Sequence, residues 1–183
     1  MSLKKKIANK VKKYIYWHYN ADRTVEKKIK KAIEIYHKGG YFNHRRAELT
    51  WYKMQKEYTC SYPPMIKVGE KLRIEHYMGT IIGRTAELGD NVRIYQFVNV
   101  IAKVSGDQEK FDNHERRHAK IGNNVVLGAG CTIIGPITIG DNSFIGARAI
   151  VTRDVPPNTV VIGTNIMKPR REDQIAPEYV TES

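Results

Sequence analysis

Two hydrophobic periodicities divide the chain, a helical one in the first 60 residues and a six-residue one in the second half. In the first part, apolar residues recur at three- and four-residue spacing, as on one face of a helix. The pattern predicts three helices, Leu3–Ile15, Val25–Tyr36 and about Asn43–Glu57. Gly39–Gly40 would end the second helix, because glycine readily takes the left-handed conformation of a C-cap. Pro63–Pro64 would stop the third.

In the second half, an aliphatic residue occupies nearly every sixth position. These positions are Ile82, Leu88, Ile94, Val100, Ile121, Leu127, Ile133, Ile139, Ile145 and Val151. A small or branched residue follows most of them four places later, and glycine follows many of them directly. A six-residue period is typical of a parallel β-helix, in which each repeat is one short strand and one turn, and the aliphatic side chain fills the interior. The sequence therefore predicts a mainly β fold, a parallel β-helix of hexapeptide repeats after a short α-helical region.

The predicted organisation has three parts. Residues 1–60 form a basic helical region, residues 61–170 form the β-helix and residues 171–183 form a C-terminal tail. The six-residue register is lost over residues 102–120, a polar segment that must loop out of the wall of a solenoid. Loops carried by a rigid scaffold are common places for functional residues.

The net charge of +12 at pH 7 is concentrated in the N-terminal third. Residues 1–60 carry 16 Lys and Arg against 5 Asp and Glu, whereas residues 61–183 carry 15 against 14. A basic amphipathic helix can bind an anionic membrane surface, but a solvated helix face shows the same alternation of Lys and apolar residues. We favour the solvated face, so peripheral membrane contact by the first helix is the weaker interpretation. We expect no nucleic-acid partner, because the main body is nearly neutral.

Two cysteines, Cys60 and Cys131, lie 71 positions apart in a chain that shows no apolar secretory leader. No apolar run reaches the roughly 20 residues of a membrane span. We therefore expect reduced thiols and a cytoplasmic protein.

The repeats carry a resemblance to a known family. Segments such as IGNNVVLGAGCTIIGPITIGDNSFIGARAIVTRDVPPNTVVIG resemble the hexapeptide-repeat acyltransferases. Within that superfamily, LRIEHYMGTIIGRTAELGDNVRIYQFV and the later RRHAKIG are similar to the serine O-acetyltransferase branch. The resemblance covers about residues 61–170. It implies a left-handed β-helix, a homotrimer, and acetyl transfer from acetyl-CoA to a hydroxyl of a small acceptor.

L-Serine is the acceptor that the resemblance implies first. The alternative is a sugar hydroxyl in surface-polysaccharide biosynthesis, because the N-terminal helices are much shorter than the helical domain typical of the branch.

The candidate general base is His76, in the irregular step between Ile74 and Ile82 where a side chain can leave the wall. Three of the six histidines lie among the predicted helices, where packing or surface roles suffice. Acetyl transfer to a hydroxyl needs a base, and an imidazole with a pKa near 6.5 accepts a proton at neutral pH. The resemblance also places the catalytic base at His76.

The resemblance implies an acceptor site as well. Glu75 stands where the family has an acceptor-binding acid, usually Asp, and Arg117 and His118 match its Arg–His pair facing the acceptor. A guanidinium can clamp a carboxylate through two parallel hydrogen bonds. At the position where the family has an Asp that orients the catalytic base, this chain has Ser61. Either Glu75 or another acid orients His76, or the base works with weaker help, or the acceptor is not serine.

Coenzyme A needs a narrow apolar groove for pantetheine and cations or amides for its phosphates. The resemblance implies coenzyme contacts at Ala129, Ala147, Thr152 and Arg153, and phosphate contacts at Lys168 and Arg170. At the position of one arginine of the family, this chain has Met167. We expect acetyl-CoA as the cosubstrate and no metal.

The insertion also contains a zinc-protease signature, HExxH, from His114 to His118. That chemistry needs both histidines on one helix, and a loop beside a β-coil does not supply one, so we attribute the match to chance. A rival interpretation uses His76, His114 and His118 as three zinc ligands, as in carbonic anhydrases that share the left-handed β-helix. Their spacing is compatible with this, but the match at Arg117–His118 favours the acetyltransferase.

Overall fold

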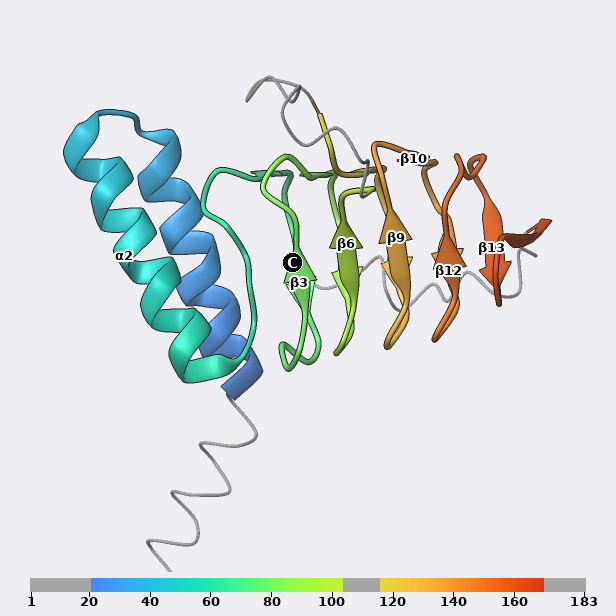
Figure 1. The fold of residues 1–183 in the computed structure, drawn as a ribbon, viewed down its shortest axis with the longest axis horizontal. Helices are drawn as coiled ribbons and strands as arrows, with labels where there is room; N and C mark the ends of the chain where they lie inside the picture. Colours follow the sequence, from blue (N-terminus) through green and yellow to red (C-terminus); the bar gives the residue numbers. More distant parts are fainter. Residues whose placement is uncertain (1–20, 104–115, 170–183) are drawn as a thin grey trace, which may run out of the picture.

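The computed structural model describes residues 21–103 and 116–169. A helix over residues 21–37 and helix α2 (Tyr41–Tyr58) lie side by side at one end of a long stack of short strands (Figure 1). Between the helices, Gly39 and Gly40 have φ values of 72° and 84°, in the left-handed region that glycine enters without a Cβ clash. The second and third predicted helices are thus confirmed. The first, Leu3–Ile15, lies outside the described residues.

Fourteen strands of the described residues form three sheets, which we call the first, second and third faces. The first face contains β1 (Lys67–Val68), β4 (Glu87–Leu88), β7 (Lys120–Ile121) and β10 (Thr138–Ile139). The second contains β2 (Arg73–Ile74), β5 (Arg93–Ile94), β8 (Val126–Leu127), β11 (Phe144–Ile145), β13 (Thr159–Ile162) and β14 (Ile166–Pro169). The third contains β3 (Ile81–Ile82), β6 (Asn99–Ile101), β9 (Thr132–Ile134) and β12 (Ile150–Val151).

From β1 to β12, successive strands along the chain fall on successive faces, so each set of three makes one coil. Strands stacked on one face pair in parallel, except that β14 folds back antiparallel on β13. In a typical two-residue strand one side chain points inward and the next outward, because side chains alternate across a strand. The result is a three-sided parallel β-helix, which confirms the architecture predicted from the six-residue period.

The interior is filled by the predicted aliphatic positions. All ten are at most 3 % exposed, and the small or branched residues four places after most of them are buried too. Ser143, a polar member of that second set, donates its hydroxyl to the carbonyl of Pro156 at 3.0 Å. Full burial of one such aliphatic side chain contributes about 1.5–3 kcal/mol. Burial of these repeated positions therefore stabilises the β-helix.

An asparagine ladder lines the corner between the first and second faces. Asn91, Asn124, Asn142 and Asn158 have φ values from 53° to 59°, a region that Asn tolerates better than most residues. Their side-chain amides bond from one coil to the next, for example Asn91 Nδ2 to Asn124 Oδ1 at 2.9 Å. This corner is thus held by side chains as well as by strand pairing.

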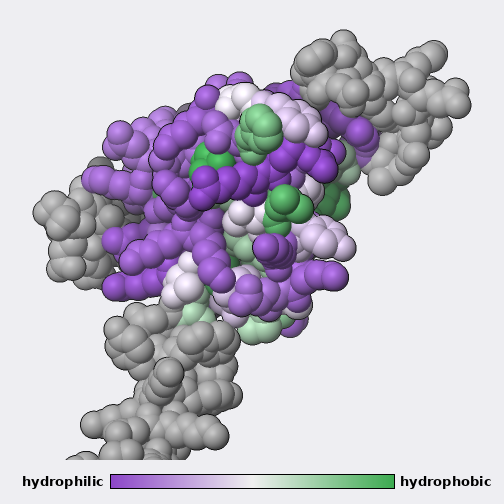
Figure 2. Space-filling model, turned by 90° about the vertical axis from the view of Figure 1, so that its left-hand side faces the viewer, coloured by the Kyte–Doolittle hydropathy of each residue, from purple (hydrophilic) through white to green (hydrophobic). Residues whose placement is uncertain are grey.

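The two helices close the open end of the β-helix. Residues from the first helix, from α2 and from the first coil join one buried cluster, which includes Val25, Ile29, Ile33, Met54, Tyr58, Tyr62, Ile66 and Leu72. The outer surface of this end is mostly hydrophilic, with a few separate hydrophobic spots (Figure 2). Among the residues described, no helix is long and apolar enough to cross a membrane.

The polar insertion leaves the wall between the third and first faces. β6 ends at Ile101 and β7 begins at Lys120, and the pairing of Leu88 with Ile121 shows that the coil resumes in register. Residues 104–115 lie outside the described part of the chain. Arg116 donates to the carbonyls of Pro136 at 2.7 Å and Ile137 at 3.4 Å, which ties the returning segment to the next coil.

Both cysteines are free and buried. Burial raises the pKa of Cys60 to about 11 and that of Cys131 to about 12, so both are thiols at neutral pH. They serve as packing residues of the core, in agreement with the expected reduced state.

Candidate active site

The side chain of His76 projects from the turn between β2 and β3 and meets a carboxylate. Its Nδ1 lies 3.0 Å from Oδ2 of Asp22, and the other carboxylate oxygen accepts a hydrogen bond from the backbone N–H of Tyr77 at 3.3 Å. The two side chains are 58 % and 28 % exposed. Nε2 of His76 bonds to none of the described residues. One ring nitrogen is therefore held by a carboxylate, while the other is available to a ligand.

Asp22 reaches this position through the docking of the first helix. Glu26, one turn further along, accepts a hydrogen bond from the backbone N–H of Ile74 at 3.1 Å. β2 is the last strand of the second face, so this N–H has no neighbouring strand to bond to. Residues four apart share one helix face, and the two carboxylates therefore contact the first coil together. Asp22 was not among the residues predicted from the sequence, although two acids at i and i+4 beside an apolar stripe are a usable signal.

The other candidates for orienting His76 lie elsewhere. The hydroxyl of Ser61 accepts a hydrogen bond from Nε2 of Gln55 at 2.9 Å. The carboxylate of Glu75 forms an ion pair with Arg93, with 3.4 Å between Oε1 and Nη1. Of the possibilities left open by the sequence, the structure places an acid other than Glu75 beside the imidazole.

A pocket of about 370 Å³ opens beside His76. It is lined by Ala21, Asp22, His76, Tyr77, Met78, Gln96 and Phe97. Met78 and Phe97 are more than half exposed and give it an apolar wall. The side-chain oxygen of Gln96 is buried and has no hydrogen-bond partner among the described residues. The pocket thus combines apolar walls with a few polar groups, as small-molecule sites do.

The turns that join the second face to the third stack in a column, which we call the His76 corner. Backbone hydrogen bonds link its levels, from Gly130 N–H to Gln96 O and from Arg148 N–H to Ala129 O, both at 2.9 Å. Ala129 is half-buried and Ala147 is exposed on this column. The structure therefore places these two predicted coenzyme residues on the same edge as the candidate base.

Arg117 and His118 lie on a different edge, the corner between the third and first faces, which we call the His118 corner. Thr152 and Arg153 follow β12 on the same corner, where Thr152 N–H donates to Asn165 Oδ1 at 3.0 Å. The third face separates the two corners. Within one chain, the structure does not bring Arg117 and His118 to His76.

Of the two residues predicted to meet the phosphates, Lys168 is exposed on β14, and Arg170 lies outside the described residues.

His118 is half-buried and closely held. Its Nδ1 is 2.8 Å from the hydroxyl oxygen of Thr85. Burial lowers the pKa of the imidazole, and the positive charge of Arg117 lowers it further. His118 is therefore neutral at neutral pH.

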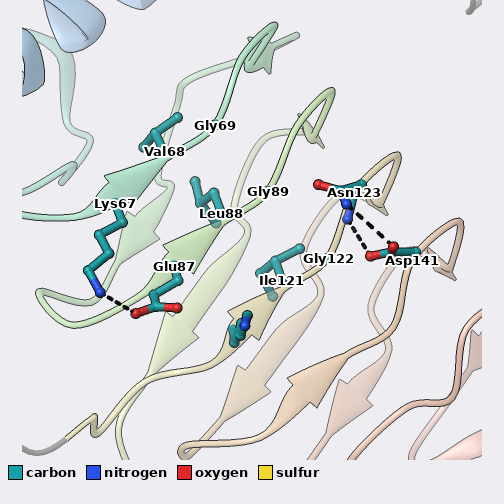
Figure 3. Close-up of a pocket in the computed structure, with 11 residues that line it drawn as sticks. Lys67, Val68, Gly69, Glu87, Leu88, Gly89, Ile121, Gly122, Asn123 and Asp141 are labelled. Atoms are coloured by element: carbon teal, nitrogen blue, oxygen red, sulfur yellow. Dashed lines mark hydrogen bonds and ion pairs between the residues drawn. The ribbon is translucent and has the colours of Figure 1, made fainter.

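A second pocket, of about 430 Å³, opens on the first face (Figure 3). Lys67 and Glu87 form an ion pair of 2.8 Å at one side, and Asp141 accepts from the backbone N–H of Asn123 at 2.7 Å at the other. None of the residues predicted for the site lines it. Lys67 and Glu87 are thus paired with each other, and the carboxylate of Asp141 is bonded to Asn123.

The zinc interpretation needs three histidines at one point. His76 and His118 lie on different corners, and His114 is outside the described residues. Among the residues described, no group of three or more His, Cys, Asp or Glu could hold a metal ion.

The repeats match a known family model over part of the chain. Residues 118–153 match a family model described as bacterial transferase hexapeptide, six repeats. Solved structures of similar fold share the left-handed β-helix, which agrees with the expected handedness.

The particular relatives are serine acetyltransferases. That of Mycobacterium tuberculosis is 41 % identical over 102 residues, which are 55 % of this chain and 41 % of the relative. That of Helicobacter pylori is 42 % identical over 101 residues, 55 % of each chain. The chain spans about half the length of the curated relatives it matches.

Among solved structures, serine acetyltransferase of Neisseria gonorrhoeae has a TM-score of 0.68 at 29 % identity, over 85 % of this chain and 57 % of that one. Soybean serine acetyltransferase complexed with serine has a TM-score of 0.66 at 28 % identity, over 79 % and 55 %.

Proposed function

We propose that this chain is an acetyl-CoA-dependent O-acetyltransferase whose acceptor is a small hydroxyl compound, with L-serine as the first candidate. The observation that carries the proposal is the His76–Asp22 pair, which lines a pocket and leaves Nε2 of the imidazole without a hydrogen bond to any described residue. The names of the similar proteins support the same reaction.

In the proposed reaction, Nε2 of His76 takes the proton of the acceptor hydroxyl as its oxygen attacks the thioester carbonyl carbon. A carbon–oxygen bond forms, the carbon–sulfur bond breaks, and the proton passes from the imidazolium to the departing thiolate of coenzyme A. Asp22 holds Nδ1 and stabilises the positive charge that the ring carries between these two transfers. Ala129 and Ala147 leave room along the His76 corner for pantetheine. Thr152, Arg153, Lys168 and Arg170 are the proposed contacts further along the coenzyme.

We further propose a homotrimer, supported by the contrast between two faces. The outward side chains of the third face include Ile81, Ile101, Ile134 and Ile150, and the first and last of these are 47 % and 40 % exposed. The outward side chains of the first face are Lys67, Glu87, Lys120 and Thr138. An apolar face is stabilised by burial against another surface.

Three third faces packed around one axis would set the His76 corner of one protomer beside the His118 corner of the next, because these corners flank that face. Each site would then take His76 from one protomer and Arg117, His118, Thr152 and Arg153 from its neighbour, because these four residues lie on the His118 corner. The guanidinium of Arg117 suits the carboxylate of an amino acid.

A sugar acceptor is the second candidate, and one observation favours it. Glu75, expected to bind the acceptor, is in an ion pair with Arg93 and does not line the pocket. A cytoplasmic location completes the proposal, supported by two unbridged cysteines.

The test is thiol release from acetyl-CoA with L-serine and with a panel of sugars. His76→Asn should lower the rate by at least about 100-fold, because a positioned base contributes about 10²–10⁴. His44→Asn is the matched control, since His44 stacks on Tyr36 in the helical pair, with ring centres 4.3 Å apart. No transfer to any acceptor, together with no coenzyme binding by calorimetry, would overturn the proposal.

A further inference from the structure

The second histidine of the proposed site is held by a threonine in a way that determines which of its nitrogens carries hydrogen. Thr85 lies on the His118 corner, one coil before His118. Its hydroxyl oxygen accepts the backbone N–H of Arg117 at 2.9 Å and that of His118 at 3.2 Å. The same oxygen is 2.8 Å from Nδ1 of His118.

The hydrogens at this point can be assigned from the number of donors. A hydroxyl has one hydrogen and two lone pairs, and the two backbone N–H groups occupy both lone pairs. The contact with Nδ1 must therefore use the hydrogen of the hydroxyl. The backbone N–H of Thr85 also points to Nδ1, at 3.4 Å. Nδ1 faces two donors and so accepts, which leaves the ring hydrogen of the neutral imidazole on Nε2.

Gly83 holds the other side of the ring. A Cβ at this position would overlap Cδ2 and Nε2 of His118, so the imidazole lies directly against the glycine backbone. The ring is thus confined by Gly83 on one side and by Thr85 on the other. Nε2 makes no hydrogen bond to any described residue, so its hydrogen is available to a ligand.

We propose that Thr85 is a positioning residue that fixes His118 as a neutral Nε2–H donor, aimed at an oxygen atom of the bound acceptor, such as a carboxylate oxygen. This inference rests on the proposed function, in which His118 faces the acceptor. It gives the two imidazoles different roles. His76 takes a proton, whereas His118 donates a hydrogen bond and takes none. The lowered pKa of His118 agrees with this role, because the ring stays neutral.

Nitrogen NMR of the ring tests the tautomer in the unmodified protein at pH 7.5. The expected result is one neutral His118 ring with hydrogen on Nε2. A ring with hydrogen on Nδ1, or a protonated ring, would overturn the inference whatever the enzymatic activity. Conversely, an absence of acetyl transfer to every acceptor would defeat the proposed function while leaving the tautomer measurement valid.

Two substitutions at Thr85 test the positioning role. Thr85→Val removes the hydroxyl and should populate both tautomers and raise KM for the acceptor about tenfold, with KM for acetyl-CoA unchanged. Thr85→Ser keeps the hydroxyl and should restore both readouts. If Thr85→Val does not fold, His118→Gln and His118→Leu replace it. Glutamine keeps an N–H near Nε2 and should bind acceptor better than leucine, and equal acceptor KM values for these two would refute the donor role.

Discussion

Replacement of Asp22 by asparagine tests whether the first helix supplies the carboxylate that orients the proposed base. The amide keeps the size of the side chain and can still accept the N–H of Tyr77, but it loses the negative charge beside Nδ1 of His76. A hydrogen bond to a charged group contributes about 1.5–3 kcal/mol. Because the side chains of Asp22 and His76 are 28 % and 58 % exposed, solvent screening reduces this contribution to about 1–2 kcal/mol. At about 1.4 kcal/mol per factor of ten, kcat/KM should fall about 5- to 30-fold.

The matched control is Glu26→Gln. Glu26 lies on the same face of the same helix and accepts the backbone N–H of Ile74, but it does not touch His76. The glutamine oxygen can still accept that N–H, so kcat/KM should stay within about twofold of the unmodified protein. Thiol release gives kcat/KM, and urea unfolding checks that both variants keep similar stability. Full activity in Asp22→Asn, or equal losses in the two variants, would refute the assignment of Asp22.

Three further expectations concern assembly, the core and titration. Ile150→Arg on the third face should reduce the mass measured by light scattering from that of three 21.0-kDa chains to that of one. Thr138→Arg on the first face is the control and should leave the trimer intact. A trimeric Ile150→Arg variant would contradict the proposed interface. Ile133→Ala, at a fully buried position in the middle of the stack, should lower the free energy of unfolding by about 2–5 kcal/mol in urea, and a loss below about 1 kcal/mol would show that this position is not tightly packed. The pKa of His118 is lower in the folded protein than in the unfolded chain, so as the pH drops the imidazole is protonated first in the unfolded chain. The free energy of unfolding should therefore fall as the pH drops from about 6.5 through the folded pKa. His118→Gln should remove this pH-dependent contribution. If the unfolding free energies of the variant and the unmodified protein differ by the same amount at pH 7.5 and pH 5.5, the contribution of His118 is refuted.

The β-helix was predictable because its information is local. Each coil repeats the same requirement, an inward aliphatic residue every sixth position, so residues such as Ile133 and Ile145 show their role without reference to distant parts of the chain. The helix ends were predictable for a similar reason, since Gly39 and Gly40 mark a conformation that few other residues adopt.

The site was predictable only in part. His76 stood out because it interrupts the six-residue register, and the structure places it in a pocket. Glu75 was the nearest acid in the sequence, yet its carboxylate pairs with Arg93. Adjacent residues at a corner point in different directions, so proximity in the sequence did not identify the partner of His76.

By itself, the sequence determined the architecture, the inward positions and the identity of the candidate imidazoles, because these follow from spacing and residue type. Only the tertiary structure decided which groups meet. Asp22 reaches His76 across 54 positions because the helix docks on the open edge of β2, a contact between two surfaces that no periodicity encodes. The insertion at residues 102–120 breaks the six-residue count, so the separation of His76 and His118 onto two corners became visible only once the faces were assembled.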